Sequence, residues 1–593
     1  MKISPNTLTL KQFFSVANEQ FVIPAYQRRY AWGAKEQRDL FNDIRLLPAG
    51  DTHLLGTVLL LSEAYTPILN QLELVDGQQR ITTISILMIV LAEQLESKNL
   101  GKKAADLRKL LECERGDSEE LPKIKLGDLD DPEYQRVMVN TRDDECENPQ
   151  LVGARENFTN WFEVFSAQDL VVFQSKLLNS AALIRLDVSA AKDAYKLFET
   201  INNRGLRLKP TDIIKNFLLG HASSLPKETL EKVKNDWRQL IVALDGLDSD
   251  DFFRQWLAGK LHRKVTNGKV VVDFRSYYFR HVTEAETMTE FLSSNLRTDD
   301  EDDDFEDVAV LDEDNTEIAP KTKKVKLVSF AKDLRKASEL YAKLLKADMT
   351  SKKVNRHMEN LRRIKAFQAF TWLLDMFDRN CLDEKTHIRL LRALEAFMMR
   401  RHICEKRANE LETIFSGLTG IDDEGYEATV LDTLREHTPP DREFESSFAD
   451  FPFVAAVIDR ARYALEMFEY EAITHKNEYY LATPDELQLE HIIPQAAEKS
   501  ITKAALGDWP TYLGGDWKSK HAKNLHRIGN MTLLANKLNV KASNNPFLAK
   551  RVEYDQSNIK LTKNLVAYSQ FKFKAVDDRS KALAKLAVQI WKV

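Results

Sequence analysis

The chain has 593 residues, which is too long for one hydrophobic core, so about two to four domains are expected. Apolar residues make up 43% and charged residues 30%, as in ordinary soluble globular proteins. The longest apolar run, at 81–92, is too short to span a bilayer, and the N-terminal stretch lacks the apolar core of a signal peptide. We therefore expect a cytoplasmic protein with no membrane partner.

The charge of the chain is distributed unevenly. The formal net charge is -6, yet residues 491–593 carry 18 Lys and Arg against 7 Asp and Glu, a net of +11. Such a basic end on an acidic protein indicates contact with a polyanion, although a solvated lysine-rich surface would give the same count. The four cysteines are scattered and form no CxxC pair, which argues against a structural zinc site or a disulfide framework.

The first 95 residues are predicted to mix short strands with helices. The β-rich stretches and the segments with helical spacing alternate along the chain. We predict strands at 21–24, 54–62 and 72–75, and helices at 35–47 and 80–95.

Farther along, helices dominate the prediction. Residues 96–150 are polar, and we predict that they form an irregular insertion over the first domain. Residues 151–235 have helical spacing with one strand near 183–188, and strong helical periodicity returns over 321–412. Residues 236–295 are also expected to be helical.

An acidic block interrupts the helical middle. Twelve acidic residues and no Lys or Arg occur between Asp299 and Glu317. Because such a block repels itself, a mobile loop over 298–320 is expected. A nucleic-acid mimic that covers a basic groove is the alternative.

Two N-terminal segments carry groups suited to a phosphate: YQRRYAW at 26–32 and DGQQR at 76–80. Gly77 permits a tight turn between a strand and a helix, where backbone N–H groups can face an anion. Arg80 can donate two hydrogen bonds to a phosphate, and Asp76 can hold a cation or orient a water. The alternative is that the arginines only form ion pairs that close the domain.

A third segment, at 198–216, also combines polar and charged residues with a glycine turn. It reads FETINNRGLRLKPTDIIKN. We predict a helix that ends near Arg204-Gly205 and a capped helix that starts at Thr211-Asp212. A packed helix-turn-helix without chemistry is the alternative.

The C-terminal part contains the residue pattern of an HNH nuclease finger. Glu490-His491 is followed by IIPQ, and RIGNMTLL comes some thirty residues later, at 527–534. His491, at the end of a short strand, can take a proton from an attacking water. Asn530, at the turn into a second strand, can bond the backbone of the His491 loop.

The same finger offers oxygen ligands for a metal. Glu490 supplies a carboxylate, and Asn539 lies at helical spacing after the second strand, with Asn536 as its competitor one turn earlier. Oxygen ligands favour Mg²⁺ or Mn²⁺ over Zn²⁺. A buried His–Asn hydrogen-bond network without metal is the alternative, and His526 is a spare candidate, structural or phosphate-facing.

The three N-terminal motifs together closely resemble the GmrS-type domain of the GmrSD family of type IV, modification-dependent restriction endonucleases. The resemblance implies a ParB/sulfiredoxin-like fold associated with nucleotide binding and hydrolysis. It places the nucleotide site at Tyr26, Gln27, Arg28, Asp76, Gly77, Gln78, Gln79 and Arg80, with Asn202, Asp212 and Lys215 in support.

The other end of the chain resembles the GmrD-type HNH domain of the same family. The matching residues run in the expected order: Arg400-Arg401, EHIIP at 490–494, GNMTL at 529–533, Ser543-Asn544, Phe547 and Lys550, the last as a supporting residue. One departure is that many HNH fingers begin with Asp-His, whereas this one has Glu-His. The longer carboxylate shifts the expected metal position somewhat.

These observations predict an α+β multidomain protein. Its expected parts are a nucleotide-binding sensor domain over 1–235, a helical region over 236–399 and a helical nuclease domain with the HNH (ββα-metal) finger over 400–593. The protein is predicted to be a nucleotide-dependent phage-defence enzyme that cleaves modified double-stranded DNA, with modified cytosine as the favoured modification. It would require Mg²⁺ or Mn²⁺ and a nucleoside triphosphate, and cutting both strands would favour a homodimer. The alternatives are a DNA-sensing or nicking defence protein whose main chemistry is nucleotide hydrolysis, and an RNase toxin.

Overall fold

The structure is a computed structural model that describes residues 4–62, 66, 68–115, 119–141, 148–202, 209–288, 324–379, 381–473, 486–498 and 507–593. The acidic block predicted over 298–320 lies outside these residues. The chain forms two compact units. Unit 1 comprises Met1–Arg254 and Thr266–Glu339, and unit 2 comprises Gln255–Val265 and Leu340–Val593. The three-part division made from the sequence stays a prediction.

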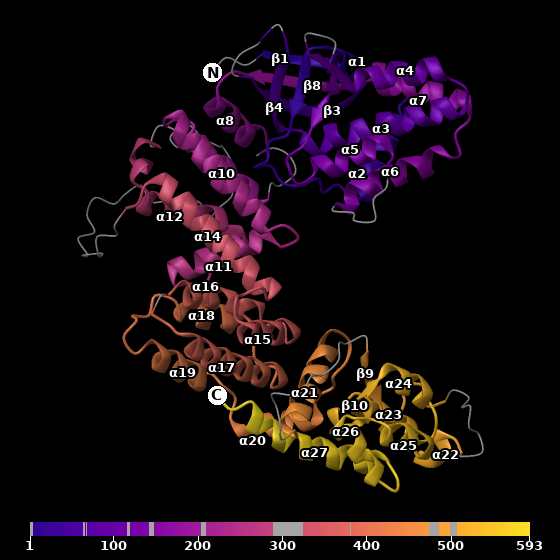
Figure 1. The fold of residues 1–593 in the computed structure, drawn as a ribbon, viewed down its shortest axis with the longest axis vertical. Coiled ribbons are helices and arrows are strands. Elements are labelled where there is room, and N and C mark those ends of the chain that lie inside the picture. Colours follow the sequence, from indigo (N-terminus) through magenta and orange to yellow (C-terminus); the bar gives the residue numbers. More distant parts are fainter. Residues whose placement is uncertain are drawn as a thin grey trace, which may run out of the picture. The chain divides into compact units, whose positions relative to one another are not determined.

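Unit 1 is built on a mixed sheet of six strands in the order β1-β8-β3-β4-β2-β7 (Figure 1). Two of its pairings are antiparallel, β1 with β8 and β3 with β4, and the other three are parallel. The strands are β1 (Ser4–Thr9), β2 (Glu19–Val22), β3 (His53–Leu61), β4 (Asn70–Asp76), β7 (Ile124–Lys125) and β8 (Ala181–Val188).

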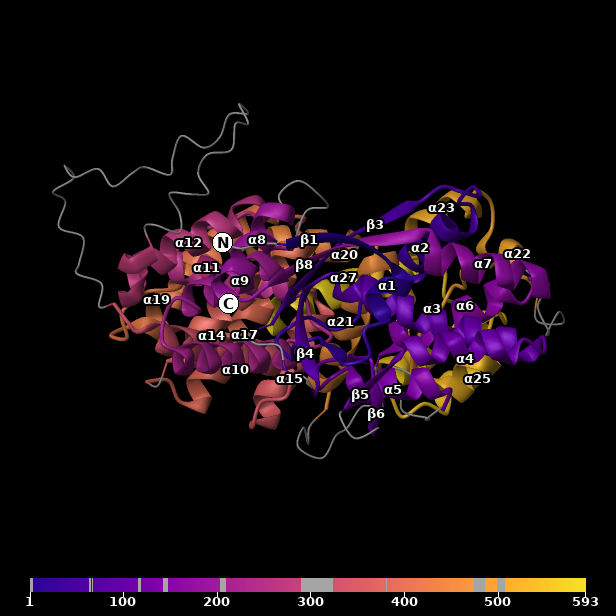
Figure 2. The same cartoon turned by 90° about the horizontal axis from the view of Figure 1, so that it is seen from above.

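Helices cover both faces of this sheet. The long helix α3 (Gln78–Ser97) is apolar around most of its circumference and is buried along nearly its whole length, against α4, α6 and α7. Helix α8 (Ala191–Asn202) lies away from this group and packs on β3, β4 and β8 (Figures 1 and 2). The remaining elements of unit 1 are α1 (Leu10–Phe14), α2 (Ala34–Arg45), α4 (Gly101–Leu110), α5 (Asp131–Val139), α6 (Pro149–Phe162), α7 (Ala167–Asn179), α9 (Pro210–Ala222), α10 (Lys227–Ala243), α12 (Val270–His281) and the hairpin β5 (Glu112–Arg115) with β6 (Glu119–Pro122).

The irregular insertion predicted over 96–150 is wrong in part. The described residues of this stretch form α4, α5 and three strands, and β7 extends the central sheet. Leu107 and Tyr134 are fully enclosed in the core of unit 1. Each of these short elements buries only a narrow apolar face, so its charged outer face dominates the composition and hides the periodicity.

Unit 2 is mostly helical, and two of its three boundaries with unit 1 fall within helices, α11 (Ser249–Leu261) and α14 (Leu327–Lys346). Its one described hairpin pairs β9 (Leu487–His491) with β10 (Met531–Ala535), which places His491 opposite Met531. The helices are α15 (Lys352–Arg363), α16 (Phe370–Asp378), α17 (Glu384–Ile403), α18 (Asn409–Gly417), α19 (Tyr426–Glu436), α20 (Asp441–Asp450), α21 (Ile458–Glu471), α22 (Trp509–Leu513), α23 (Trp517–Asn524), α24 (Asn536–Ala542), α25 (Phe547–Asp555), α26 (Lys560–Lys563) and α27 (Phe573–Ile590).

The hairpin is anchored by a compact apolar cluster. Ile492 and Ile493, directly after β9, pack with Leu534 of β10 and with Phe547 at the start of α25. Within the described part of the chain, none of the helices has the length and apolar character needed to cross a bilayer.

Two candidate functional sites

The structure brings the three N-terminal motifs together. The Gln27 amide donates to the backbone carbonyl of Val75 in β4 (3.0 Å), and its oxygen accepts a hydrogen bond from Lys215 of α9. Arg28 and Lys215 both lie near Asp212, at 3.8 and 3.7 Å. The YQR segment, the end of β4 and the start of α9 therefore form one polar cluster.

Lys215 lies at the centre of this cluster. Its side chain is buried, and burial lowers its pKa, while Asp212 and then Asp76 oppose this shift and Arg28 adds to it. Asp76, the last residue of β4, is thus electrostatically coupled to a lysine that is 139 positions away in the sequence. The phosphate contact expected of this cluster stays a prediction.

Tyr26 points into the protein interior. Its hydroxyl donates to Glu73 of β4 and lies 3.0 Å from the Tyr195 hydroxyl of α8. Burial, then the charges of Tyr195 and Glu73, raise the pKa of Tyr26 well above its ordinary value. Tyr26 therefore ties the YQR segment to the sheet and to α8.

The members of DGQQR have different surroundings. Gly77 begins α3 with φ of +90°, and a Cβ there would lie 3.1 Å from Val58, so the turn requires glycine. Gln79 accepts from the backbone N–H of Ala31 (2.7 Å) and donates to the carbonyl of Arg29 (3.2 Å). Gln79 thus holds the YQRRYAW segment against α3.

Arg80 and Gln78 flank that contact. Arg80 donates to the Thr57 carbonyl (3.0 Å), and burial lowers its pKa, with Asp76 opposing the shift. A Cβ on Gly56 would lie 3.0 Å from the Arg80 guanidinium, so the arginine lies directly on β3. The Gln78 amide oxygen, in contrast, is buried and accepts no hydrogen bond.

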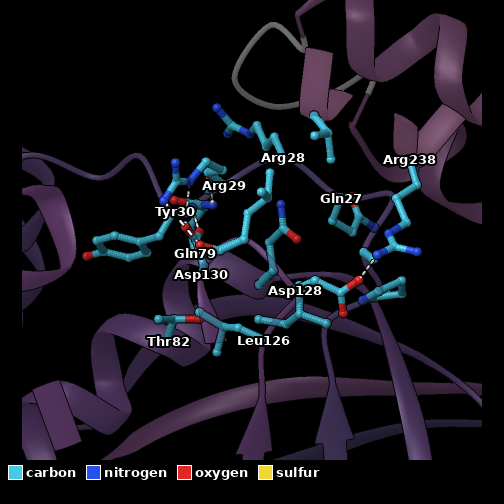
Figure 3. Close-up of a pocket in the computed structure, with 17 residues that line it drawn as sticks. Gln27, Arg28, Arg29, Tyr30, Gln79, Thr82, Leu126, Asp128, Asp130 and Arg238 are labelled. Atoms are coloured by element: carbon cyan, nitrogen blue, oxygen red, sulfur yellow. Dashed lines mark hydrogen bonds and ion pairs between the residues drawn. The ribbon is translucent and has the colours of Figure 1, made fainter. Parts of the chain in front are cut away.

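A pocket opens beside these residues (Figure 3). Its apolar lining includes Ile23, Leu126 and Val242, and Gln78 also lines it. In Figure 3 an ion pair between Arg238 and Asp128 closes one side. The full lining is Ile23, Pro24, Ala25, Gln27, Arg28, Arg29, Tyr30, Gln78, Gln79, Thr82, Leu126, Gly127, Asp128, Leu129, Asp130, Arg238 and Val242.

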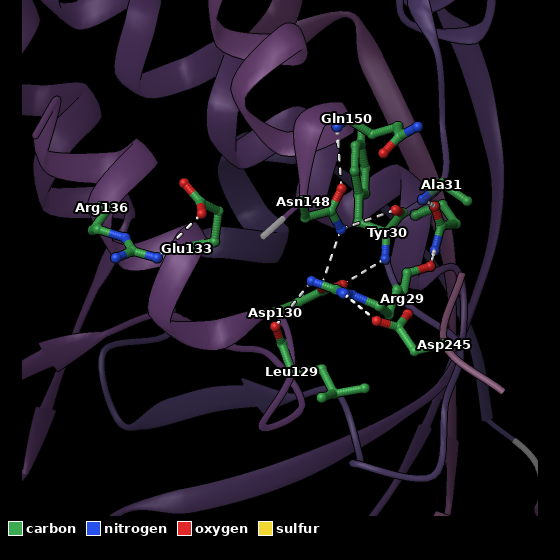
Figure 4. A network of polar contacts seen from close by, with 11 residues as sticks. Arg29, Tyr30, Ala31, Leu129, Asp130, Glu133, Arg136, Asn148, Gln150 and Asp245 are labelled. Carbon is green, nitrogen blue, oxygen red and sulfur yellow. Dashed lines mark hydrogen bonds and ion pairs between the residues drawn. The ribbon is translucent and has the colours of Figure 1, made fainter. Parts of the chain in front are cut away.

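The other side of the pocket is a network around Arg29 (Figure 4). Arg29 bonds Asp130 of the α5 N-terminus and Asp245, which follows α10, each at 2.7 Å. Asp130 also accepts from the backbone N–H of Tyr30 (2.6 Å) and from Asn148 (2.9 Å). Sequence reasoning missed these partners and Arg238, because they lie in polar stretches far from the motifs and no local pattern marks them.

The third motif differs in part from its prediction. Thr211 does not cap α9, which starts at Pro210; instead the Thr211 N–H bonds the carboxylate of Asp250 (2.9 Å). The cap comes from another helix, which local sequence cannot reveal. Asn202 ends α8, its side chain is not described, and the predicted helix end at 204–205 lies outside the described residues.

The second site lies on the hairpin of unit 2. His491 ends β9 as predicted, and burial, with His526 and Lys550 adding to it, lowers its pKa to about 4. Its Nδ1 lies 3.3 Å from the Gln495 amide, and its Nε2 is buried without a hydrogen-bond partner. His526 is the neighbouring ring, with a centroid distance of 5.5 Å. The His491 imidazole is therefore neutral at pH 7 and keeps a lone pair.

Glu490 is held by two residues of α25. Lys550 Nζ (2.6 Å) and the Tyr554 hydroxyl (3.0 Å) both donate to its Oε1. Lys550 also donates to the backbone carbonyl of His491 (2.8 Å). Burial raises the pKa of Glu490, and Lys550 opposes that shift. The Glu490-His491 pair is thus fixed by one buried lysine.

Asn530 makes the predicted contact with the His491 loop. Its amide oxygen accepts from the Ile493 N–H (2.8 Å), and its amide nitrogen donates to the carbonyls of Ile493 and Leu525 (both 3.0 Å). Its side chain is fully buried. A glutamine or aspartate could not reproduce all three bonds in this space.

Asn539 lies on α24 and is tied to β9. Its amide nitrogen donates to Gln488 (2.8 Å), which shares a strand face with Glu490 two residues on. Glu490 itself is tied to Lys550 and Tyr554, so its pairing with Asn539 as a metal ligand stays a prediction. Asn536, the first residue of α24, is exposed. No group of three or more His, Cys, Asp or Glu suited to a metal occurs among the described residues.

Two family models define the class of this protein as a restriction nuclease, a hydrolase that acts on DNA. The GmrSD restriction endonuclease N-terminal domain matches residues 10–219, and the GmrSD restriction endonuclease C-terminal domain matches residues 438–586. The chain belongs to the GmrSD restriction endonuclease family. A search of curated proteins gave no match.

Proposed function

We propose that this protein is a type IV, HNH-type endonuclease that hydrolyses modified DNA with a divalent cation and is controlled by a nucleoside triphosphate. The observation that carries the proposal is the hairpin itself. It places Glu490-His491 beside the buried Asn530, which bonds the backbone of the loop after His491. Its second strand is followed by α24, which carries Asn539. The basic net charge of residues 491–593 suits a DNA substrate.

His491 is the proposed general base. The ring is neutral because burial and nearby positive groups lower its pKa, so it accepts the proton of the attacking water. Asn530 holds the loop that orients this ring, and Lys550 fixes the backbone of His491 from the other side. A Mg²⁺ or Mn²⁺ ion held by Glu490 and Asn539 would supply positive charge for the phosphodiester.

The N-terminal cluster is the proposed nucleotide site, on a ParB/sulfiredoxin-like domain. Arg28 is 40% exposed beside the buried Lys215, so its guanidinium can contact a triphosphate. Gln78 lines the adjoining pocket, and its buried amide oxygen accepts no hydrogen bond. We propose that this site binds and hydrolyses the nucleotide and that two chains pair to cut both strands.

The test is cleavage of phage DNA with or without modified cytosines, in Mg²⁺, with and without each nucleoside triphosphate. His491→Ala should abolish cutting and leave folding and DNA binding intact. His437→Ala, an exposed histidine in the same unit, is the matched control and should cut normally. Near wild-type cutting by His491→Ala would remove His491 from the mechanism.

A further inference from the structure

Helix α27 grips the turn that carries Asn530. Arg579 Nη1 donates to the carbonyl oxygens of Met531 (2.6 Å) and Gly529 (2.9 Å). The next residue, Ser580, accepts a hydrogen bond from the Gly529 N–H (3.0 Å). One turn of α27 therefore satisfies backbone groups on both sides of Asn530.

The contact between the turn and the helix is as close as backbones allow. A Cβ on Gly529 would lie 2.1 Å from the carbonyl oxygen of Val576 and 2.4 Å from the Ser580 hydroxyl. Only glycine fits there. The turn therefore cannot shift toward α27, and the bonds from Arg579 and Ser580 prevent it from moving away.

The same turn fixes the loop after His491. Asn530 bonds both backbone groups of Ile493 through its side chain, and its own carbonyl accepts from the Ile492 N–H (2.9 Å). The two residues that follow His491 are thus both bonded to Asn530, and the turn that carries Asn530 is held by α27. A displacement of the turn would be transmitted directly to His491.

Arg579 also lies close to the other arm of the site. Its guanidinium is buried, and its positive charge opposes the rise in the pKa of Tyr554. The Tyr554 hydroxyl in turn donates a hydrogen bond to Glu490. Burying a charged group has a large desolvation cost, and a neutral donor could bond the same backbone carbonyls without that cost. The Arg579 charge lies near both the Asn530 turn and the Tyr554–Glu490 contact. A fixed guanidinium at this position holds the two parts of the proposed site in one geometry.

We propose that Arg579 and Ser580 are positioning residues for the hydrolysis: they hold the Gly529–Asn530 turn and thereby orient His491. The inference rests on the proposed nuclease function, and neither residue touches the reacting atoms. Under this proposal, α27 contributes to the hydrolysis although its sequence contains no recognisable catalytic motif.

The test compares Ser580→Ala and Arg579→Lys with Ala587→Gly. The control weakens α27 at a buried position seven residues beyond Ser580. Cleavage kinetics, thermal midpoint, and hydrogen exchange of the Ile492 and Ile493 amides are measured for each. We expect both positioning variants to lower kcat by about 10- to 100-fold at unchanged KM, and to speed exchange of the two amides.

Ala587→Gly should lower the thermal midpoint while kcat and the exchange of both amides stay near wild type. The proposal is overturned if Ser580→Ala leaves kcat and exchange unchanged, or if the control loses kcat in proportion to its stability. Ser580→Ala removes a single oxygen, so it decides the matter if Arg579→Lys does not fold. If the wild type cuts no DNA, the nuclease proposal fails, while faster exchange in Ser580→Ala would still support the clamp.

Discussion

Lys550 Nζ lies 2.6 Å from Oε1 of Glu490, and both side chains are buried. The same ammonium bonds the backbone carbonyl of His491. The lysine therefore links the proposed metal ligand to the proposed base. Because the pair is enclosed, each partner depends on the other for compensation of its charge.

The first prediction concerns this pair. Lys550→Met should lower the free energy of unfolding by about 3–5 kcal/mol, because the Glu490 carboxylate would stay buried without its cation. The double variant Lys550→Met/Glu490→Gln should be more stable than Lys550→Met, since it removes the uncompensated charge. Denaturant titrations of the three proteins measure both differences. A double variant no more stable than the single one would show that the loss comes from packing and not from charge.

The second prediction concerns the metal ligand on α24. Asn539→Ala should raise the Mg²⁺ concentration needed for half-maximal cleavage by about tenfold or more, because it removes one of two proposed protein ligands. Asn536→Ala is the matched control one turn away and should leave this concentration unchanged. Cleavage rates over a Mg²⁺ series report the outcome. If Asn536→Ala needs more metal and Asn539→Ala does not, the assignment is wrong by one helical turn.

The elements around the hairpin were predictable from sequence because each has its own local signal, while the chemical roles of their residues stay predictions. The strand before His491, the glycine turn with the second strand and the helix after it each have a local pattern, although α22 and α23 lie between the two strands. The spacing did not reveal that Arg579 of α27 clamps the turn, because a tertiary contact leaves no periodic signal.

The N-terminal site shows the limits of the same reasoning. The motifs predicted that Gln27 and Asp76 belong to one site, and the structure brings their segments together. Asp130 and Arg238, which line the pocket, and Asp245, which bonds Arg29, are ordinary surface-type residues by composition. These residues reach the site because α5 and α10 pack beside the YQRRYAW segment. That packing is a tertiary feature, which local sequence does not show.

The third prediction separates two arginines at that site. Arg28→Ala should weaken nucleoside triphosphate binding by about ten- to a hundredfold, the loss of one charge-assisted bond to phosphate, with little change in stability. Arg80→Ala and Asp76→Ala should also eliminate hydrolysis, but Arg80→Ala should in addition lower the thermal midpoint, because its guanidinium supports β3.

Calorimetric titration of folded variants with a panel of nucleoside triphosphates, together with melting curves, measures these effects. Arg108→Ala removes an exposed arginine that pairs with Glu96 and serves as the control. Unchanged affinity in both Arg28→Ala and Arg80→Ala would contradict the phosphate site and leave the domain without its proposed ligand.

The fourth prediction concerns DNA contact along α24. Lys537 and Lys541 are exposed on the helix that carries Asn539, so DNA at the proposed metal site should lie against them. Each lysine-to-alanine change should weaken binding to any sequence and reduce the slope of log affinity against log salt by about 1. Lys585→Ala, on the exposed side of α27, is the control. Equal slopes in all three variants would place the DNA elsewhere.

The last prediction concerns pH and stability. His402 of α17 is held neutral, because burial, with Arg460 and Arg401 adding to it, lowers its pKa to about 3. The unfolded chain protonates this histidine near its ordinary pKa of about 6.5. As the pH falls below that value, the unfolded state gains a proton that the folded state does not, so stability is lost with falling pH. The loss from this one group should approach about 1.4 kcal/mol per pH unit between about pH 6 and pH 5.

His402→Gln removes the titrating group and should make the free energy of unfolding fall less steeply over this range. Other buried histidines and the carboxylates contribute equally to both proteins, so the difference in slope isolates His402. Denaturant titrations at half-unit intervals from pH 7 to pH 5 measure it, with His437→Gln as the exposed control. Parallel curves for wild type and His402→Gln would show that His402 takes up its proton as readily in the folded protein as in the unfolded chain.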